Sequence, residues 1–114
     1  MPHGVDRPLA EIKADLFKAL GHPVRVRTLE LLVERDRQVA DLLTELDLEA
    51  SHLSQHLAVL RRSGVVTARR TGNAVHYTLA LPAVADMLAA ARAVLVDAAA
   101  RRAEVLAEVL EEAR

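Results

Sequence analysis

The stretch SHLSQHLAVLRRSG, from Ser51 to Gly64, constrains the fold more than any other part of the sequence. Its leucines recur at three- and four-residue spacing: Leu53, Leu57 and Leu60. This spacing predicts a short helix with one buried stripe, and Ser63 and Gly64 are expected to end it. From Val65 onward the spacing becomes that of a strand. The chain must therefore fold so that a short amphipathic helix leads directly into β structure.

The face of this helix opposite the leucines carries hydrogen-bonding side chains and two permanent cations. These residues are Ser51, His52, Ser54, Gln55, His56, Arg61 and Arg62. Such a face suits the major groove of DNA, where uncharged donors and acceptors read base edges and arginines hold phosphates. An ordinary amphipathic surface helix is the alternative.

The distribution of charge favours the DNA-binding interpretation, although the net charge of the chain is only −1. Residues 50–85 contain four arginines and no acidic residue, whereas the whole chain has 16 acidic residues. The segments on either side, 1–49 and 86–114, both have a net negative charge. An acid-free block of this length predicts one face that approaches a polyanion, with a chance asymmetry over a solvated hairpin as the alternative.

Length and composition limit the fold to one domain built mainly from helices. The chain has 114 residues, of which 52% are hydrophobic, yet it has one Phe, one Tyr and no Trp. A core of Leu, Val and Ala favours packed helices over a β-sandwich. Without cysteine there is no disulfide, thiolate metal site or thiol switch. Because no apolar run reaches the ~20 residues of a membrane span and no secretory signal is present, we expect a cytoplasmic protein.

The order of patterns along the chain predicts a helix-turn-helix followed by a hairpin. Residues 1–8 contain two prolines and no periodicity, which indicates a flexible tail. Helices are expected over residues 9–20, 23–34 and 39–46, with a polar turn at 35–38. The helix at 39–46 and the helix beginning at Ser51 are separated by a tight turn, as in a helix-turn-helix.

A β-hairpin over residues 65–79 is expected directly after the helix-turn-helix. Thr71, Gly72 and Asn73 form its predicted tip, and its first strand ends in Arg69 and Arg70. A hairpin in this place is a wing, and wings lie along phosphates or enter the minor groove. Arg69, Arg70 and Asn73 are therefore the predicted DNA contacts of the wing.

The last segment, residues 82–114, predicts one long helix that serves dimerisation. A helix of ~30 residues spans ~45 Å, which is longer than so small a domain needs. A second copy is the simplest cover for its apolar stripe, together with the first helix, at residues 9–20. The predicted dimer interface is Leu9, Ile12, Leu16, Val84, Leu88, Ala91 and Leu95. A helix that folds back on its own domain is the alternative, and the last dozen residues could also fray or bend back.

Three motifs in this order resemble the ArsR/SmtB family of bacterial winged-helix repressors. They are LFKALGHPVRVRTLELL (Leu16 to Leu32), SHLSQHLAVLRRSGVV (Ser51 to Val66) and RRTGNAVHYTL (Arg69 to Leu79), and the resemblance covers about residues 9–80. It implies a mainly α fold with about five helices, a two-stranded wing and a homodimer. The part from Leu16 to Leu43 is also similar to actinobacterial members linked to anaerobic or stress-responsive operons.

The resemblance implies a dimeric repressor that binds an inverted-repeat operator over a promoter. By that resemblance, Ser51, His52, Ser54, Gln55 and His56 occupy recognition-helix positions and Arg61 and Arg62 its exit. The helix 51–63 would then enter the major groove, and the wing 65–79 would lie on the backbone or in the minor groove.

The sequence departs from the family at the positions where many members bind a metal. Where the family has a Cys-x-Cys-type motif, this chain has residues 39–43, VADLL, and at the terminal-helix site it has Leu81, Ala83, Val94 and Asp97. No cofactor and no metal effector are therefore expected. His52 and His56 lie four residues apart and could hold a metal only if a third ligand such as His76 came near.

Two further questions stay open in the sequence. A winged-helix module that binds another protein, without sequence-specific DNA binding, is the alternative function. An enzyme is not expected, because no nucleophile set, phosphate loop or metal cluster is present. Control could come from the abundance of the protein alone, or from an apolar or anionic ligand bound beside the Ala-rich stretch 89–100.

Overall fold

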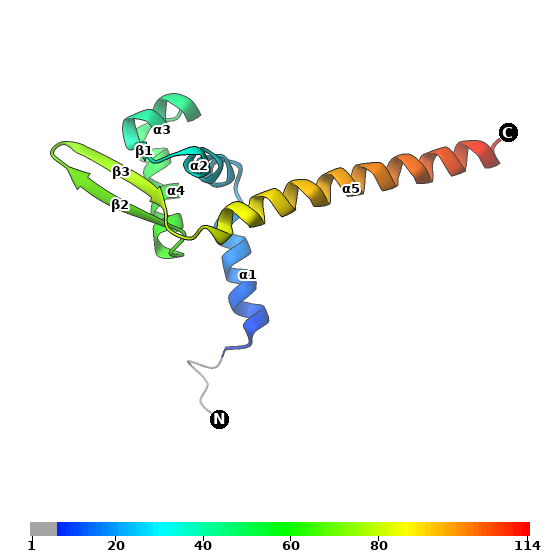
Figure 1. Ribbon diagram of the computed structural model, residues 1–114, viewed down its shortest axis with the longest axis horizontal. Helices are drawn as coiled ribbons and strands as arrows, with labels where there is room; N and C mark the ends of the chain where they lie inside the picture. The colour runs from blue at the N-terminus through cyan, green and yellow to red at the C-terminus, as the bar shows by residue number, and fades with distance from the viewer. Residues whose placement is uncertain (1–6) are drawn as a thin grey trace.

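The computed structural model describes residues 7–114, so most of the predicted N-terminal tail, residues 1–6, lies outside the described residues. Five helices and three strands follow one another in the order helix, helix, strand, helix, helix, strand, strand, helix (Figure 1). Their bounds are α1 Leu9–Leu20, α2 Pro23–Glu34, β1 Arg37–Gln38, α3 Val39–Leu46, α4 Ala50–Arg62, β2 Val66–Thr71, β3 Ala74–Leu79 and α5 Ala83–Glu112. The predicted mainly α fold with a β wing is confirmed.

The break between α1 and α2 lies where the sequence predicts it. Pro23 occupies the first position of α2, where its fixed φ and missing N–H are tolerated. His22 caps the helix, because its Nδ1 accepts a hydrogen bond of 3.1 Å from the backbone N–H of Val24. The predicted bounds of the first three helices are confirmed, and α4 begins one residue before the predicted Ser51.

The wing consists of β2 and β3, two strands of a three-stranded antiparallel sheet with the order β1-β3-β2. β2 and β3 pair over their full length, from Val66 opposite Leu79 to Thr71 opposite Ala74. The tip needs Gly72, whose φ of 62° lies in the left-handed region. The expectation of a polar turn over residues 35–38 is wrong in part, because residues 37 and 38 form β1 and pair with β3.

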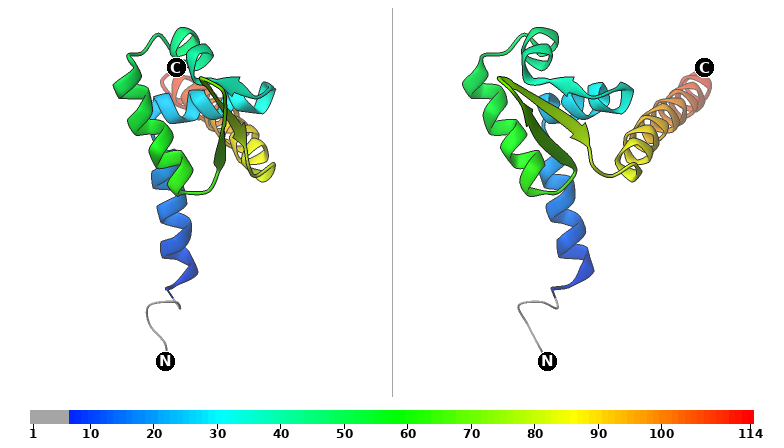
Figure 2. Two further views of the ribbon diagram at one scale, coloured as in Figure 1. Left: turned by 90° about the vertical axis from the view of Figure 1, so that its left-hand side faces the viewer. Right: turned by 60° about the vertical axis from the view of Figure 1, so that its left-hand side comes forward.

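The hydrophobic core lies where α2, α3 and α4 meet the sheet and the start of α5 (Figure 2). Its buried members are Leu20, Leu29, Leu31, Leu32, Leu42, Leu53, Leu57, Leu60, Val65, Val66, Tyr77 and Val84. One tyrosine is the only aromatic side chain among them, as the composition predicts. The core thus holds α4 against α2 and leaves the opposite face of α4 in solvent.

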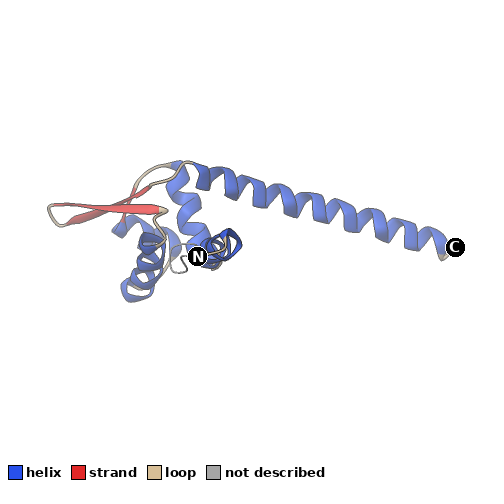
Figure 3. Cartoon of the chain, turned by 90° about the horizontal axis from the view of Figure 1, so that it is seen from below, coloured by secondary structure: helices blue, strands red, loops and turns tan. Residues whose placement is uncertain are grey.

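Helix α5 leaves this core after its first turns and continues as a single helix to Glu112. Figures 1 and 3 show it projecting away from the rest of the molecule, on the side opposite the wing tip. It does not fold back on its own domain, and its last dozen residues do not bend back. No helix among residues 7–114 combines the length and the apolar character that crossing a membrane requires.

Candidate nucleic-acid interface

Helix α4 presents two faces of opposite character, and its burial follows the leucine spacing. Leu53, Leu57 and Leu60 are at most 3% exposed. Ser51, Ser54 and Gln55 are exposed on the other face. The hydrogen-bonding groups of these three side chains are therefore available to a ligand as wide as a duplex.

The turn between α3 and α4 fixes how the second helix leaves the first. Asp47 adopts the left-handed conformation, with φ 53°, and its N–H bonds the carbonyl of Thr44. Leu48 N–H donates to the carbonyl of Leu43 at 3.2 Å, which completes the reversal. Three residues, 47–49, separate the two helices. This is the geometry of a helix-turn-helix in which α4 is the recognition helix.

The wing places its polar side chains in solvent beside α4. Arg69, Arg70 and Asn73 are all exposed, and they lie toward the tip of the hairpin. Figure 2 shows β2 following α4 through one short turn, so that the two elements lie side by side. Gly64 in that turn has a φ of 81°, as the predicted left-handed cap requires.

The exposed surface of α4 and the wing is cationic, and no acidic side chain among residues 7–114 pairs with its arginines. Arg61, Arg62, Arg69 and Arg70 are exposed, and none of them forms an ion pair within residues 7–114. Other exposed arginines do pair: Arg7 contacts Asp15 at 2.9 Å, and Arg27 contacts Glu30 at 3.6 Å. Because residues 50–85 contain no Asp or Glu, the four cations have no acidic neighbour in their own segment.

The structure corrects the prediction that His56 reads base edges. His56 is 8% exposed and lies on the buried side of α4, with its ring centroid 4.2 Å from that of His22. Its Nδ1 lies 3.1 Å from Nη1 of Arg25. The spacing in the sequence already indicated that His56 is buried, because it lies three residues after Leu53 and four before Leu60, on the same side of the helix.

Burial and neighbouring positive groups disfavour the protonated form of His56. Its pKa is lowered from the usual histidine value by desolvation first, and then by His22, Arg25 and His52. His52 itself is exposed, with its ring centroid 5.1 Å from that of His56. Of the two histidines of α4, only His52 therefore lies on the solvent face of the helix.

One buried cation, Arg37, was not found from the sequence. Arg37 is 1% exposed, and its guanidinium binds the carboxylates of Glu34, at 2.9 Å, and Glu45. These contacts join the end of α2, strand β1 and helix α3. Its Nε has no hydrogen-bond partner among the described residues. Arg37 thus holds the first helix of the helix-turn-helix against the sheet that carries the wing.

The residues predicted for the dimer interface differ in how far they are exposed. Leu9, Ile12 and Leu95 are 63%, 47% and 71% exposed, Ala91 is exposed, and Leu16 and Leu88 are half-buried. Val84 is a correction: it is 3% exposed and belongs to the core of its own chain.

No group of three or more His, Asp or Glu side chains within residues 7–114 is placed to hold a metal ion. His52 and His56 lie close together, but the third partner of their cluster is His22 at the start of α2, not His76 in β3. The absence of a metal effector stays a prediction.

The fold and this surface define a winged helix-turn-helix. The family model described as "Bacterial regulatory protein, arsR family" matches residues 22–68, from the cap of α2 into β2. A curated relative, described as an uncharacterized HTH-type transcriptional regulator, Rv0081 of Mycobacterium tuberculosis, is 54% identical over 103 residues. That match covers 90% of each chain. The chain therefore belongs to the arsR family and is a transcriptional regulator with a winged-helix DNA-binding domain, not an enzyme.

Solved structures of relatives share this architecture. The crystal structure of Rv0081 has a TM-score of 0.78 at 55% identity and covers 85% of this chain and 98% of its own. HlyU from Vibrio cholerae, which is described among curated proteins as a transcriptional activator, has a TM-score of 0.70 at 33% identity, covering 77% and 96%. The solution structure of Mb0332 from Mycobacterium bovis, described as a homodimeric winged helix-turn-helix DNA-binding domain, has a TM-score of 0.71 at 30% identity, covering 85% and 92%.

Proposed function

We propose that this chain is a homodimeric repressor that binds an inverted-repeat operator. In this proposal α4 enters the major groove and the wing lies on the phosphate backbone or in the minor groove. The observation that supports it best is the surface of α4 and the wing, where four exposed arginines without an ion pair among residues 7–114 lie at the end of α4 and in β2, beside the hydrogen-bonding face of the helix. Neutral side chains can read bases while the arginines bind phosphates.

Each exposed residue of this surface has a proposed task. Gln55 projects away from the leucine stripe, and its amide can form two hydrogen bonds to an adenine edge. Three further exposed residues of the same helix would contact bases or sugars beside the contact of Gln55. They are Ser51, His52 and Ser54. The arginines Arg61, Arg62, Arg69 and Arg70, with Asn73 at the wing tip, would bind the backbone. His56 has no place in this set.

The homodimer is proposed from the exposed apolar side chains of α1 and α5. Leu9, Ile12 and Leu95 are large and exposed, and Ala91 and Leu88 lie between Leu95 and the core. A two-fold axis through this surface would place two α4 helices on one side of the dimer. Mb0332, whose described form is homodimeric, has the same fold.

Repression is proposed because a dimer that occupies promoter DNA excludes polymerase from it. HlyU is described as an activator, so the position of the operator decides the direction of control. A reporter with the operator placed inside the promoter should lose expression when the chain is present. Increased expression from the same reporter would show activation instead.

Binding of the chain to the DNA upstream of its own gene, measured over a range of salt concentrations, tests the proposed function. Each phosphate contact releases counterions, so the affinity should fall steeply as salt increases. A chain that binds only protein partners through its winged-helix domain would show no such dependence on DNA.

We further propose that metals do not control DNA binding. The family's metal-binding positions hold apolar residues such as Leu81 and Val94, and only Asp97 could be a ligand. Titrating the DNA complex with Zn, Ni, Co, arsenite and oxidants should leave the affinity unchanged. A tenfold weakening, ~1.4 kcal/mol of coupling, by any of them would overturn this proposal.

Besides control by the abundance of the protein, a ligand bound beside the Ala-rich part of α5 could control DNA binding. A hollow of about 220 Å³ lies between α1, α2 and α5, lined by Phe17, Leu20, Gly21, Val26, Met87, Leu88 and Ala91. It touches only the start of the stretch 89–100, and its lining is apolar. Control by abundance therefore remains the preferred proposal.

A further inference from the structure

Arg25, in the first turn of α2, connects three helices through one guanidinium. Its Nε donates to the carbonyl of Ala19 at 2.7 Å and its Nη2 to the carbonyl of Lys18 at 3.3 Å, both at the end of α1. Its Nη1 lies 3.1 Å from Nδ1 of His56 in α4. A guanidinium donates and never accepts, so Nδ1 of His56 must be unprotonated and accept this bond.

The surroundings of His56 oppose a second positive charge. Arg25 and His22 face its ring from α2 and its cap, and His52 faces it from α4. From α1 the contacts to Arg25 are made by the backbone carbonyls of Ala19 and Lys18. All three side chains facing His56 carry or can acquire a positive charge, and no ion pair within residues 7–114 neutralises Arg25.

We propose that Arg25 and His56 form a positioning pair that sets the angle of the recognition helix α4 for DNA, and that protonation of His56 releases it. The proposal rests on the proposed DNA-binding function. Because Arg25 also binds the end of α1, a helix of the proposed dimer surface, the pair connects that surface to α4. Neither residue touches DNA in this account; they act through the orientation of α4.

The direction of the pH dependence follows from the hydrogen bond. A protonated imidazole is a donor at both nitrogens, so Nδ1 can no longer accept from Arg25. The pKa of His56 is lowered in the folded protein, chiefly by burial, so the unfolded chain binds more protons there. The stability that the pair contributes is complete above the usual histidine pKa of about 6.5, and it is lost as the pH falls from that value through the lowered pKa of His56 in the folded protein.

The variant His56→Asn tests the pH dependence. Asparagine places an oxygen acceptor near the position of Nδ1 and does not titrate. Affinity for one DNA site would be measured at constant ionic strength from about pH 7.5 down through the pH at which NMR shows the His56 ring of the folded protein to be protonated. Across that range, the affinity of the wild type relative to His56→Asn should fall at least about fivefold. Because both proteins keep His52 and the other exposed groups, the ratio of their DNA affinities removes any effect of those groups on binding. Parallel pH profiles would overturn the proposal.

Arg25→Lys tests the positioning role at a single pH, and it decides the matter alone if His56→Asn fails to fold. Lysine keeps the charge but has one nitrogen, which cannot span Ala19, Lys18 and His56. At about pH 7.5 the affinity for DNA should fall at least about fivefold with the dimer intact. Arg27→Lys is the matched control, because Arg27 is exposed and pairs only with Glu30 on the surface. Equal affinities for the Arg25→Lys and Arg27→Lys proteins would overturn the proposal.

Nitrogen NMR of the histidine rings in the DNA-free wild type separates this proposal from the proposed function. Nδ1 of His56 should be unprotonated, and the ring should titrate below the usual histidine pKa. A chain with this NMR behaviour that binds no DNA at any salt concentration would contradict the proposed function, and the positioning role with it. A chain that binds DNA with parallel pH profiles would contradict the positioning role alone.

Discussion

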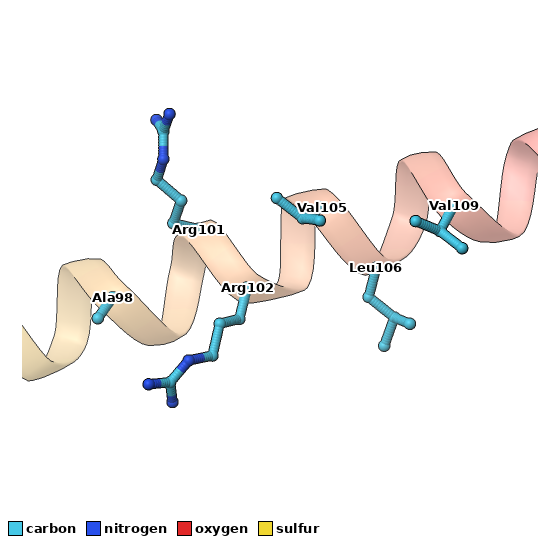
Figure 4. A pocket seen from close by; sticks show the side chains of 6 residues that line it. All are labelled: Ala98, Arg101, Arg102, Val105, Leu106 and Val109. Atoms are coloured by element: carbon cyan, nitrogen blue, oxygen red, sulfur yellow. The ribbon is translucent and has the colours of Figure 1, made fainter.

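Helices α4 and α5 carry the same kind of apolar stripe but bury it to opposite extents. In α4 the stripe residues Leu53, Leu57 and Leu60 are all buried within the chain. In α5 only Val84 is buried, whereas Leu95 is 71% exposed and further valines and leucines are exposed as far as Leu110. Figure 4 shows Val105, Leu106 and Val109 on the outer part of α5, next to Arg101 and Arg102.

Length explains this difference. With 13 residues, α4 packs on the core through its leucines, whereas α5 has 30 residues and extends past the core. The burial of α4 is therefore decided within one chain, and that of α5 by what the chain assembles with. An amphipathic pattern identifies a face to be covered, but it does not say which chain covers it.

The largest effect should come from the buried stripe of α4. Leu53→Ala should lower the free energy of unfolding by about 2–5 kcal/mol, because it leaves a cavity under the recognition helix. Chemical denaturation at several protein concentrations measures this loss. A cost below about 1 kcal/mol would mean that α4 is not packed as described.

The exposed stripe of α5 should respond differently. Leu95→Asp should leave each chain folded but dissociate the dimer, since it places an unpaired charge in the proposed interface. DNA affinity should fall with it by more than tenfold. Sedimentation and DNA binding of the same samples check both effects.

Val96→Asp is the matched control for Leu95→Asp. Val96 is also exposed, at 57%, but it is the next residue along and points away from the stripe. It should remain dimeric. Equal dissociation of both variants, or a wild type that is a stable monomer at micromolar concentration, would contradict the assignment of the stripe to a second copy.

A smaller effect is expected from the wing. Replacing Arg69 and Arg70 with Ala should weaken binding to all DNA sequences and reduce the slope of log affinity against log salt by about one to two units. Replacing Arg101, on the far half of α5, and Arg114, two residues after its end, is the control and should leave the slope unchanged. An unchanged slope for the wing variant would place the wing away from the DNA.

The smallest expected effect concerns base recognition by α4. Gln55→Ala should relax the preference at one base pair in each half-site, worth about 1–3 kcal/mol. Competition between the preferred site and a site changed at single positions measures it. If specific and non-specific DNA lose affinity equally, Gln55 positions the protein without reading sequence.

The sequence predicts most of the fold because its helix signals are local. The break at Gly21 and Pro23 and the leucine spacings give the helix bounds to within two residues, the largest difference being at the end of α5. Strand β1 was missed, because two polar residues are too short to show a period of two. The burial of Arg37 was missed for a different reason, because it depends on Glu34 and Glu45 converging from two different helices.

For the candidate site, the sequence predicts the residues at the centre of the exposed face of α4 better than those at the border with the buried stripe. Ser51, Ser54 and Gln55 are exposed as expected, because they lie opposite the leucines. His56 lies beside the stripe. Because it is polar it was predicted to face solvent, but Arg25 and His22 provide a polar environment for it on the buried side. Pairs of this kind join distant parts of the chain and cannot be read from periodicity.

Selection of binding sites from random DNA by the full-length wild-type chain tests the central claim most directly. A dimer that presents two α4 helices should enrich an inverted repeat whose half-sites are centred about 10–10.5 base pairs apart, one turn of the duplex. Enrichment of a single half-site would contradict the dimer. No enrichment over the starting pool would contradict sequence-specific DNA binding itself.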